Sequence, residues 1–181
     1  MRVITGIAAG KPLDTLEGLD VRPTVSRVKE ALFSSIQFEI PGSTVIDLFA
    51  GSGQLGLECL SRGARRAVFV DNSKRSLDIV RRNLEKCSLQ SSAQLVNSDS
   101  ISYLKTCSEY FDIALLDPPY NSGLIESALP LLVQKMAQDA VIICESPFER
   151  ELPEKVGDFK ICKFKKYGKT KLTYYRKSLG K

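Results

Sequence analysis

A glycine-rich turn in this chain has the residue types of a ligand-binding loop. Ala50-Gly51-Ser52-Gly53-Gln54-Leu55-Gly56 follows an apolar run and opens a helical pattern. Glycines allow a tight turn and a close approach of a ligand to the backbone, and a helix start offers free N–H groups to a carboxylate or phosphate. Asp71 lies twenty residues after Gly51, where an acid accepts ribose hydroxyls in dinucleotide-binding proteins. The turn by itself does not choose between a nicotinamide cofactor and another adenosine-bearing ligand.

Asp47 narrows the choice of ligand. It lies inside an otherwise apolar run, where a carboxylate is costly to bury unless it has partners. This acid would repel a dinucleotide pyrophosphate, whereas it would attract a ligand with a cationic centre and an amino group. S-adenosylmethionine has both, in its sulfonium and its α-ammonium group. The sequence therefore favours S-adenosylmethionine as the cofactor.

A second segment, Asp117-Pro118-Pro119-Tyr120, follows another apolar run. The two prolines fix φ and remove two N–H donors, so that carbonyl groups and the Asp117 side chain can face a pocket as acceptors. Such acceptors suit the exocyclic amine of a nucleobase and would orient it for in-line attack on a methyl sulfonium. Tyr120 offers a flat face on which the base can stack. The segment predicts direct methyl transfer to an amine, without a covalent enzyme intermediate.

The elements that must position these two segments alternate along the chain. Near-continuous apolar runs predict buried strands of a parallel sheet at residues 44–49, 67–70, 94–96, 113–116 and 140–144. Between them, helical patterns cover residues 54–62, which end at Gly63, and residues 73–87, with Ser73 as the N-cap. This alternation predicts an open, mostly parallel α/β sheet with right-handed crossovers.

The two ends of the chain differ from this alternating part. Residues 1–15 resemble a short hairpin or strand, and a helix with Thr24 as its N-cap follows and ends before Pro41-Gly42. At the other end, strands at about 159–166 and 171–176 flank a four-residue link, which permits only an antiparallel pair. We find no long linker and no repeat. The chain is predicted to be one domain, residues 1–181, with a small N-terminal extension (1–42) on a Rossmann-like core (43–181).

Composition excludes several classes of function. No apolar run exceeds about five residues, so a membrane-spanning segment is not expected, and the N-terminus has no secretory signal, which predicts a cytoplasmic protein. The absence of histidine excludes imidazole catalysis and histidine-ligated metal sites. The five widely spaced cysteines predict buried, reduced thiols and no metal site.

The positive charge is concentrated near the end of the chain. Residues 155–181 carry ten Lys or Arg and one acid, a net charge of +9, whereas residues 1–154 carry sixteen and twenty, a net charge of −4. Lys163, Lys165 and Lys166 alternate with apolar residues and predict a strand pair with one basic face that could bind phosphates. The alternative is a solvated, lysine-rich sheet edge that discourages aggregation.

The motifs together resemble a known enzyme family. Asp117-Pro118-Pro119-Tyr120 and Asp47-Leu48-Phe49-Ala50-Gly51-Ser52-Gly53 are similar to motifs of the class I S-adenosylmethionine-dependent amino-methyltransferases. Three more segments narrow the resemblance to the bacterial 16S rRNA guanine-N2 methyltransferase family RsmD: Arg22-Pro23-Thr24-x-x-Arg27-Val28-Lys29-Glu30-Ala31-Leu32-Phe33, Leu60-Ser61-Arg62-Gly63-Ala64 and Tyr167-Gly168-Lys169-Thr170. The resemblance covers nearly the whole chain. The acceptor motif alone is shared with adenine-N6, cytosine-N4 and glutamine-N5 enzymes.

The resemblance implies a role for each of these residues. It implies transfer of a methyl group from S-adenosylmethionine to the N2 amine of a guanine in 16S ribosomal RNA. The catalytic residues would be Asp117, Pro118, Pro119 and Tyr120, which would hold the guanine. The cofactor would be bound by Asp47, Gly51 and Gly53 at its methionine half, by Asp71 at the ribose, and by Asn72, Ser98 and Asp99 near the adenine.

The RNA side of the site is implied less directly. Arg22, Thr24 and Arg27 would close over the site and contact cofactor or RNA, although Arg22 and Arg27 could instead be surface charges at a helix start. The target base would be flipped out of its stack while basic residues hold the phosphates. The partner would be 16S rRNA or an assembly intermediate of the small ribosomal subunit, and the enzyme is expected to be a monomer.

Three alternatives remain open at this point. A nicotinamide oxidoreductase would use the same glycine pattern, and a non-catalytic RNA-binding module would keep the fold without methyl transfer. A DNA adenine-N6 methyltransferase would share the acceptor motif. The 181 residues contain no extra target-recognition domain of the kind that DNA enzymes usually carry, which counts moderately against DNA.

Overall fold

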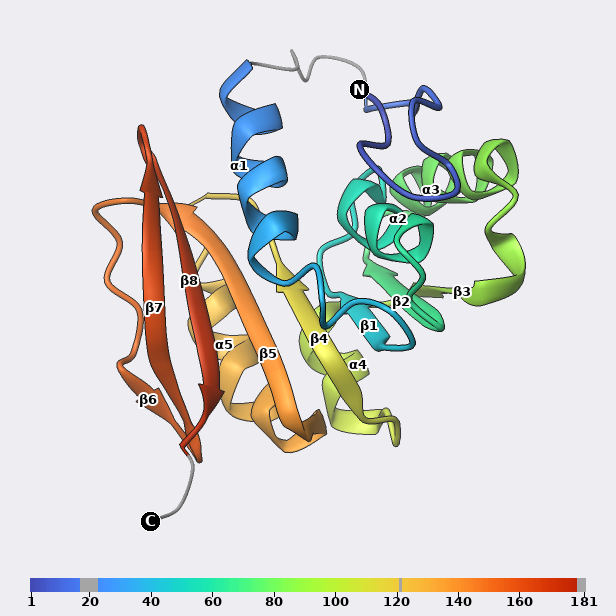
Figure 1. Ribbon diagram of the computed structural model, residues 1–181. Coiled ribbons are helices and arrows are strands. Elements are labelled where there is room, and N and C mark those ends of the chain that lie inside the picture. Colours follow the sequence, from blue (N-terminus) through green and yellow to red (C-terminus); the bar gives the residue numbers. More distant parts are fainter. Residues whose placement is uncertain (17–22, 121, 179–181) are drawn as a thin grey trace.

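Runs of aliphatic and β-branched residues form the strands of one open, twisted sheet (Figure 1). The computed structural model describes residues 1–16, 23–120 and 122–178. Within these ranges eight strands lie in the order β3-β2-β1-β4-β5-β8-β7-β6. They are β1 (Thr44–Asp47), β2 (Arg66–Asp71), β3 (Ala93–Asn97), β4 (Phe111–Leu116), β5 (Met136–Pro147), β6 (Lys155–Val156), β7 (Phe159–Tyr167) and β8 (Thr170–Lys177).

The direction of the strands follows the prediction. Strands β3, β2, β1, β4 and β5 are parallel, and β8 pairs antiparallel with both β5 and β7. The predicted α/β sheet, mostly parallel with an antiparallel pair at its C-terminal end, is confirmed. Strand β5 is longer than the predicted 140–144 because its pairing with β8 continues to Pro147, opposite Thr170.

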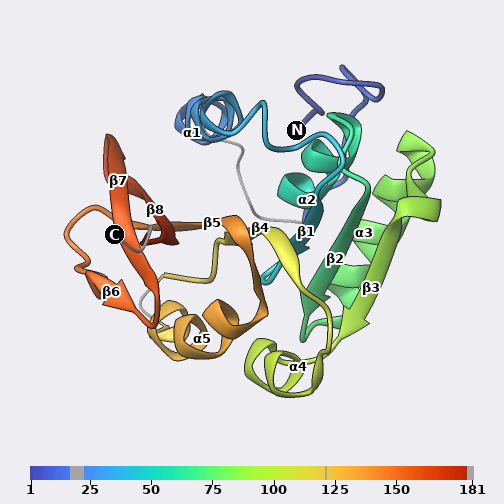
Figure 2. The ribbon, with the colours of Figure 1, turned by 60° about the horizontal axis from the view of Figure 1, so that its bottom comes forward.

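Helices cover both faces of the sheet (Figure 2). The helices are α1 (Pro23–Ser35), α2 (Gln54–Ser61), α3 (Lys74–Cys87), α4 (Ser100–Thr106) and α5 (Leu124–Leu132), with short 3-10 turns at Gln90–Ser92 and Val133–Lys135. Val45 and Ile143 pack in the core beneath α1, α2 and α3, whereas Ile46 and Ile142 pack in the core beneath α4 and α5. Because successive side chains of a strand point to opposite faces, both faces require apolar residues. This explains the continuous apolar runs of the sequence.

Helices α4 and α5 were not predicted from the sequence. Helix α4 is only seven residues long, too short to show an amphipathic period. Helix α5 contains Pro130 near its end, which is a helix-breaking signal in a sequence. Tertiary packing overrides both signals, since Leu104 of α4 and Leu129 of α5 are buried against the sheet.

The ends of the predicted helices agree with the structure in two cases and differ in one. Ser73 caps α3 by accepting a hydrogen bond from the Ser76 N–H, and Gly63 has a positive φ of 96° directly after the α2 cap. Helix α1 begins at Pro23, so Thr24 lies in its first turn and is not the N-cap. Proline is favoured at this first position because its missing N–H has no partner in a helix.

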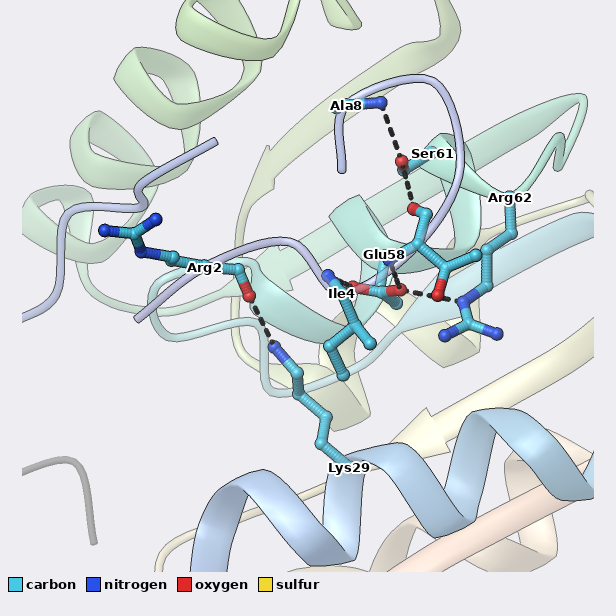
Figure 3. Close-up of polar contacts among 8 residues, drawn as sticks. Arg2, Ile4, Ala8, Lys29, Glu58, Ser61 and Arg62 are labelled. Carbon is cyan, nitrogen blue, oxygen red and sulfur yellow. Dashed lines mark hydrogen bonds and ion pairs between the residues drawn. The ribbon is translucent and has the colours of Figure 1, made fainter. Parts of the chain in front are cut away.

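The predicted N-terminal hairpin is an irregular loop with a single antiparallel bridge between Arg2 and Pro12. Its main anchor is Glu58 of α2, which is fully buried (0% exposed; Figure 3). The Glu58 carboxylate accepts hydrogen bonds from the N–H groups of Ile4 (2.8 Å) and Thr5 (2.9 Å) and from Arg62 Nε (2.7 Å). A buried carboxylate requires such donors, so the loop and α2 stabilise one another.

A glycine and a serine complete this anchor. Gly6 has φ of 90°, and a Cβ at this position would collide with the backbone carbonyl of Ser61. The Ser61 hydroxyl accepts a hydrogen bond from the Ala8 N–H at 3.0 Å and donates one to the Thr5 carbonyl. On the other side, the buried Lys29 of α1 donates to a backbone carbonyl of the same loop. The loop therefore lies between α1 and α2.

The prediction for the cysteines is correct in part. All five are free, and Cys59, Cys87 and Cys144 are buried. Cys162 is exposed, so its predicted burial was wrong; it lies where the pairing of β7 with β8 shifts register, between Ile161 and Lys163. Among the described residues, no helix combines the length and the apolar character needed to cross a lipid bilayer.

Candidate active site

A cavity of about 1090 Å³ opens at the carboxyl ends of the parallel strands. This is where ligands bind in open α/β sheets. Every predicted cofactor and acceptor residue except Gly53 lines it: Asp47, Gly51, Asp71, Asn72, Ser98, Asp99, Asp117, Pro118, Pro119 and Tyr120. The loops after β1, β2, β3 and β4 thus contribute to one site, although they are far apart in the sequence.

Asp47 is the most buried acid of the cavity, with 1% of its surface exposed. One carboxylate oxygen accepts a hydrogen bond from the Gly56 N–H at 3.0 Å. The other, Oδ1, has no donor among the residues that the structure describes, and the same holds for Oε1 of Gln54. Burial raises the pKa of Asp47 to about 7, and the negative charges of Asp117 and Asp71 contribute. Two buried acceptors without a donor fit a cationic N–H group of a ligand.

Asp71 holds the turns after β1 and β2 together. Its carboxylate accepts hydrogen bonds from the N–H groups of Gly51 (2.9 Å) and Ser73 (2.8 Å). Gly51 needs a left-handed backbone (φ 54°) to present its N–H in this direction. Each carboxylate oxygen keeps a further lone pair, so Asp71 can also accept a hydroxyl hydrogen from a ligand in the cavity.

The other two glycines of the pattern serve packing. A Cβ at Gly53 would lie 3.0 Å from both methyl groups of Val80, and a Cβ at Gly56 would collide with the ring of Phe69. Gly53 therefore faces helix α3 and does not line the cavity. Gly56 lets α2 approach β2 closely, and this approach brings the Gly56 N–H to Asp47.

The loop after β3 forms another wall of the cavity. Asp99 caps helix α4 by accepting a hydrogen bond from the Ser102 N–H at 2.9 Å, and this bond lowers the pKa of Asp99. Ser98 and Asn72 also line the cavity. These three residues give the cavity wall polar side chains.

The acceptor segment follows β4. Asp117 lies beside the cavity, and burial raises the pKa of its carboxyl group. Tyr120 is 56% exposed, and its hydroxyl lies near the side chain of Thr170 at the start of β8. Asp47 and Tyr120 thus open onto the same cavity, one at the end of β1 and the other after β4.

The lysines of β7 do not share one basic face. Lys165 lies opposite Leu172, a residue of the core beneath α1, and Lys163 points the same way. Lys166 is the next residue and points to the opposite face, where its ammonium lies 3.6 Å from the centre of the Phe148 ring. The prediction of one basic face was wrong because two of the lysines are consecutive and the period of a strand is two.

The predicted RNA-contacting residues of the N-terminal part are only partly described. Arg27 is exposed on α1. Arg22 lies outside the described residues, and Thr24 is described only as part of the first turn of α1.

Sequence reasoning missed one residue that lines the cavity, Gln54, and two that lie behind its lining, Asn83 and Glu145. Asn83 of α3 is fully buried and connects the N-terminal loop to the glycine-rich turn. Its side-chain amide accepts a hydrogen bond from the Asp14 N–H and donates to the Asp14 carbonyl. It also donates to the Ser52 carbonyl at 3.0 Å. Gln54 contributes an acceptor without a donor. Glu145 follows the apolar run of β5, as Asp47 does in β1. An acidic residue directly after a continuous apolar run was the signal that could have identified Glu145.

The chain is similar over most of its length to methyltransferases of ribosomal RNA. A family model described as conserved hypothetical protein 95 matches residues 1–176. Ribosomal RNA small subunit methyltransferase D of Haemophilus influenzae is 36% identical over 158 residues, which are 84% of this chain and 81% of that protein. The solved structure of Escherichia coli yhhF covers 99% of both chains with a TM-score of 0.88 and 33% identity. A Thermus thermophilus 16S rRNA N2 methyltransferase, RsmC, solved with AdoMet and guanosine, has a TM-score of 0.74 and 26% identity, over 90% of this chain and 45% of that chain.

Proposed function

Because this chain belongs to the family of ribosomal RNA small subunit methyltransferase D, we propose that it is an S-adenosylmethionine-dependent methyltransferase of 16S rRNA. Its acceptor is the exocyclic N2 amine of a guanine. The observation that carries this proposal is the single cavity onto which both Asp47 and Tyr120 open. Only a site that holds donor and acceptor together can transfer a methyl group directly.

The cofactor half of the cavity is built from the loops after β1, β2 and β3. When bound, S-adenosylmethionine supplies an electrophilic methyl group on a positively charged sulfur. The unpartnered oxygens of Asp47 and Gln54 would accept hydrogen bonds from its α-ammonium group. Asp71 would hold the ribose hydroxyls, with Asn72, Ser98 and Asp99 near the adenine.

The acceptor half prepares the amine for attack. The Asp117 carboxylate and the Pro118 carbonyl accept the two amine hydrogens and aim the nitrogen at the cofactor half of the cavity. The amine would take the methyl group that the cofactor supplies, and the electron pair of the carbon–sulfur bond would stay on sulfur. The amine nitrogen becomes positively charged and releases a proton, which the neighbouring carboxylate can accept. Tyr120 stacks on the base.

In this proposal the RNA is bound by residues near the start of α1 and by lysines on the α1 face of β7. In the sequence, Arg22 directly precedes α1 and Thr24 and Arg27 are part of it, whereas Lys163 and Lys165 lie on one face of β7. The substrate is 16S rRNA or an assembly intermediate of the small subunit. The enzyme acts in the cytoplasm as a monomer, and residues 1–42 extend a catalytic core of residues 43–181.

Methyl transfer to isolated 16S rRNA and to small-subunit particles from cells that lack the gene tests the function. With isotope-labelled cofactor, we expect N2-methylguanosine in the nucleoside digest, and the same nucleoside should be lost from rRNA of the deletion strain. Label in N6-methyladenine would support the alternative acceptor. RNA binding without any label would support a non-catalytic module. A thermal shift with NAD but not with S-adenosylhomocysteine would support an oxidoreductase.

Lysines on the two faces of β7 are predicted to contribute differently to RNA binding. Reversing Lys163 and Lys165 to glutamate should weaken RNA binding about tenfold and lower the slope of log affinity against log salt by roughly one to two, because two phosphate contacts are lost. Cofactor affinity should not change. Fluorescence anisotropy over a salt series measures both quantities.

A variant with Lys166 and Lys169 changed to glutamate is the control, since its net charge changes by the same amount. Lys166 lies on the other face, next to Phe148, and Lys169 lies in the turn before β8. Its RNA affinity should fall less than that of the first variant. An unchanged salt slope in the Lys163 and Lys165 variant would instead identify a solvated sheet edge.

A further inference from the structure

Glu145 places a second carboxyl group beside Asp117. In the parallel pairing of β4 with β5, Leu116 lies opposite Cys144, so the next residues, Asp117 and Glu145, are neighbours at the end of the sheet. Neighbouring strands lie roughly 4.8 Å apart, and side chains at equivalent positions point to the same face. That spacing is comparable to the width of the hydrogen-bonding edge of a purine.

The face on which Glu145 lies is the one that carries α1. Glu145 is opposite Leu172 of β8, and Leu172 is opposite Lys165 of β7, so these three residues form a row across the sheet. Leu172 belongs to the core beneath α1. Glu145 therefore shares its face with Lys165 and lies next to Asp117, which lines the cavity.

The surroundings of Glu145 are poor in positive charge. Within the described part of the chain, its side chain forms no ion pair and no hydrogen bond, while Asp117 and the Tyr120 hydroxyl lie on its acceptor side. Lys165 lies one strand beyond the uncharged Leu172. Burial and the negative charge of Asp117 raise the pKa of Glu145, and burial raises that of Asp117. Both shifts favour a proton on the pair, and the negative charge of Asp117 favours its placement on Glu145.

We propose that Glu145 is a substrate-binding residue, whose carboxyl group contacts the ring edge of the guanine while Asp117 holds the amine. This inference rests on the proposed function and deepens it, because it adds a residue that recognises the guanine ring by hydrogen bonding. The acceptor motif by itself holds only an amine, which adenine and cytosine also present. A group beside the motif is needed to recognise the rest of the base.

The chemistry of the guanine edge matches a protonated carboxyl group. Next to its N2 amine, guanine presents the N1–H donor and then the O6 acceptor. The carbonyl oxygen of a neutral carboxyl accepts from N1–H while its O–H donates to O6. An adenine held by its N6 amine would present the N1 acceptor and then a C–H group, so one of the two hydrogen bonds is lost. Glu145 therefore favours guanine over adenine.

The test compares Glu145→Ala, Glu145→Gln and the control Glu149→Gln, which changes an exposed residue a few positions along the chain. For each, kcat/KM for guanine methylation is measured from about pH 6 to about pH 9, with cofactor affinity by calorimetry. We expect Glu145→Ala to lower kcat/KM at least tenfold at neutral pH without changing cofactor affinity. Glu145→Gln should recover most of this loss, because an amide offers the same acceptor and donor. The control should resemble the wild type.

The pH profile separates this role from a purely structural one. In the wild type, kcat/KM should fall at alkaline pH as Glu145 loses its proton, whereas the Glu145→Gln profile should lack this fall. Wild-type kcat/KM in Glu145→Ala, or a Glu145→Gln variant as impaired as Glu145→Ala at neutral pH, would overturn the proposal. If Glu145→Ala does not fold, the Glu145→Gln profile decides the question. A wild-type enzyme that methylates no guanine would reject the proposed function itself, which is a separate result.

Discussion

Asp117→Ala is expected to lower guanine methylation more than tenfold while cofactor affinity stays nearly unchanged. The carboxylate acts on the acceptor amine and lies after β4, whereas the proposed partners of the cofactor follow β1, β2 and β3. Loss of one preorganised hydrogen-bonding group that acts on the transition state, such as an oxyanion-hole donor, costs about 10²–10³ in kcat, and loss of a positioned acceptor is expected to be comparable. Single-turnover assays with saturating cofactor measure the effect, and calorimetry with S-adenosylhomocysteine measures the affinity.

Asp117→Asn is the matched variant for this prediction. The amide keeps one acceptor oxygen but carries no charge and cannot take the proton of the methylated amine, so its rate should lie between those of the wild type and Asp117→Ala. Parallel losses of turnover and cofactor affinity in both variants would reject the role of Asp117 at the acceptor.

Asp47→Asn is expected to weaken binding of S-adenosylmethionine by more than tenfold. A hydrogen bond from a charged group contributes about 1.5–3 kcal/mol, and the variant replaces the carboxylate that would receive the α-ammonium group. Since the pKa of Asp47 is raised to about 7, the wild-type carboxyl group ionises as pH rises through that value, and cofactor affinity should rise with it. The affinity of Asp47→Asn should not change over this range. Calorimetry at several pH values measures both.

The stability of the protein without cofactor provides the control for Asp47. A carboxyl group whose pKa rises from 3.8 to about 7 on folding binds more protons in the folded state, so its contribution to stability falls as pH rises between these values. Asp47→Asn should therefore melt no lower than the wild type above pH 7, although it binds the cofactor weakly. A lower melting temperature together with weak binding would indicate a structural role instead.

The sequence was sufficient for the parallel strands and for most of the cavity. Both faces of the sheet are buried, so each strand had to be a continuous apolar run, and Asp47 and Asp117 stood out at the ends of such runs. Because parallel strands end at the same edge, the loops after them could be placed in one site. Glu145 also follows a continuous apolar run, residues 140–144, but this run was recognised only as a strand and the acid after it was not assigned to the site.

What the sequence could not predict depends on packing between distant segments. Helix α5 forms despite Pro130 because tertiary contacts outweigh the local signal. The exposure of Cys162 was missed because the register shift at this position is set by the pairing of β7 with β8. Gly53 and Gly56 match a ligand-binding pattern, yet their neighbours Val80 and Phe69 come from α3 and β2. No local pattern reveals those contacts.

The anchoring of the N-terminal loop also determines when the site can be completed during synthesis. Ile4 and Thr5 leave the ribosome before Glu58, their partner, and the amide of Asn83, which joins Asp14 to the Ser52 carbonyl, emerges later still. The chain between two such partners must first close into a loop, which costs conformational entropy, before their contacts can form and offset that cost. The first residues to be translated thus dock only after α2 has emerged, and the glycine-rich turn reaches its final form only when α3 has emerged.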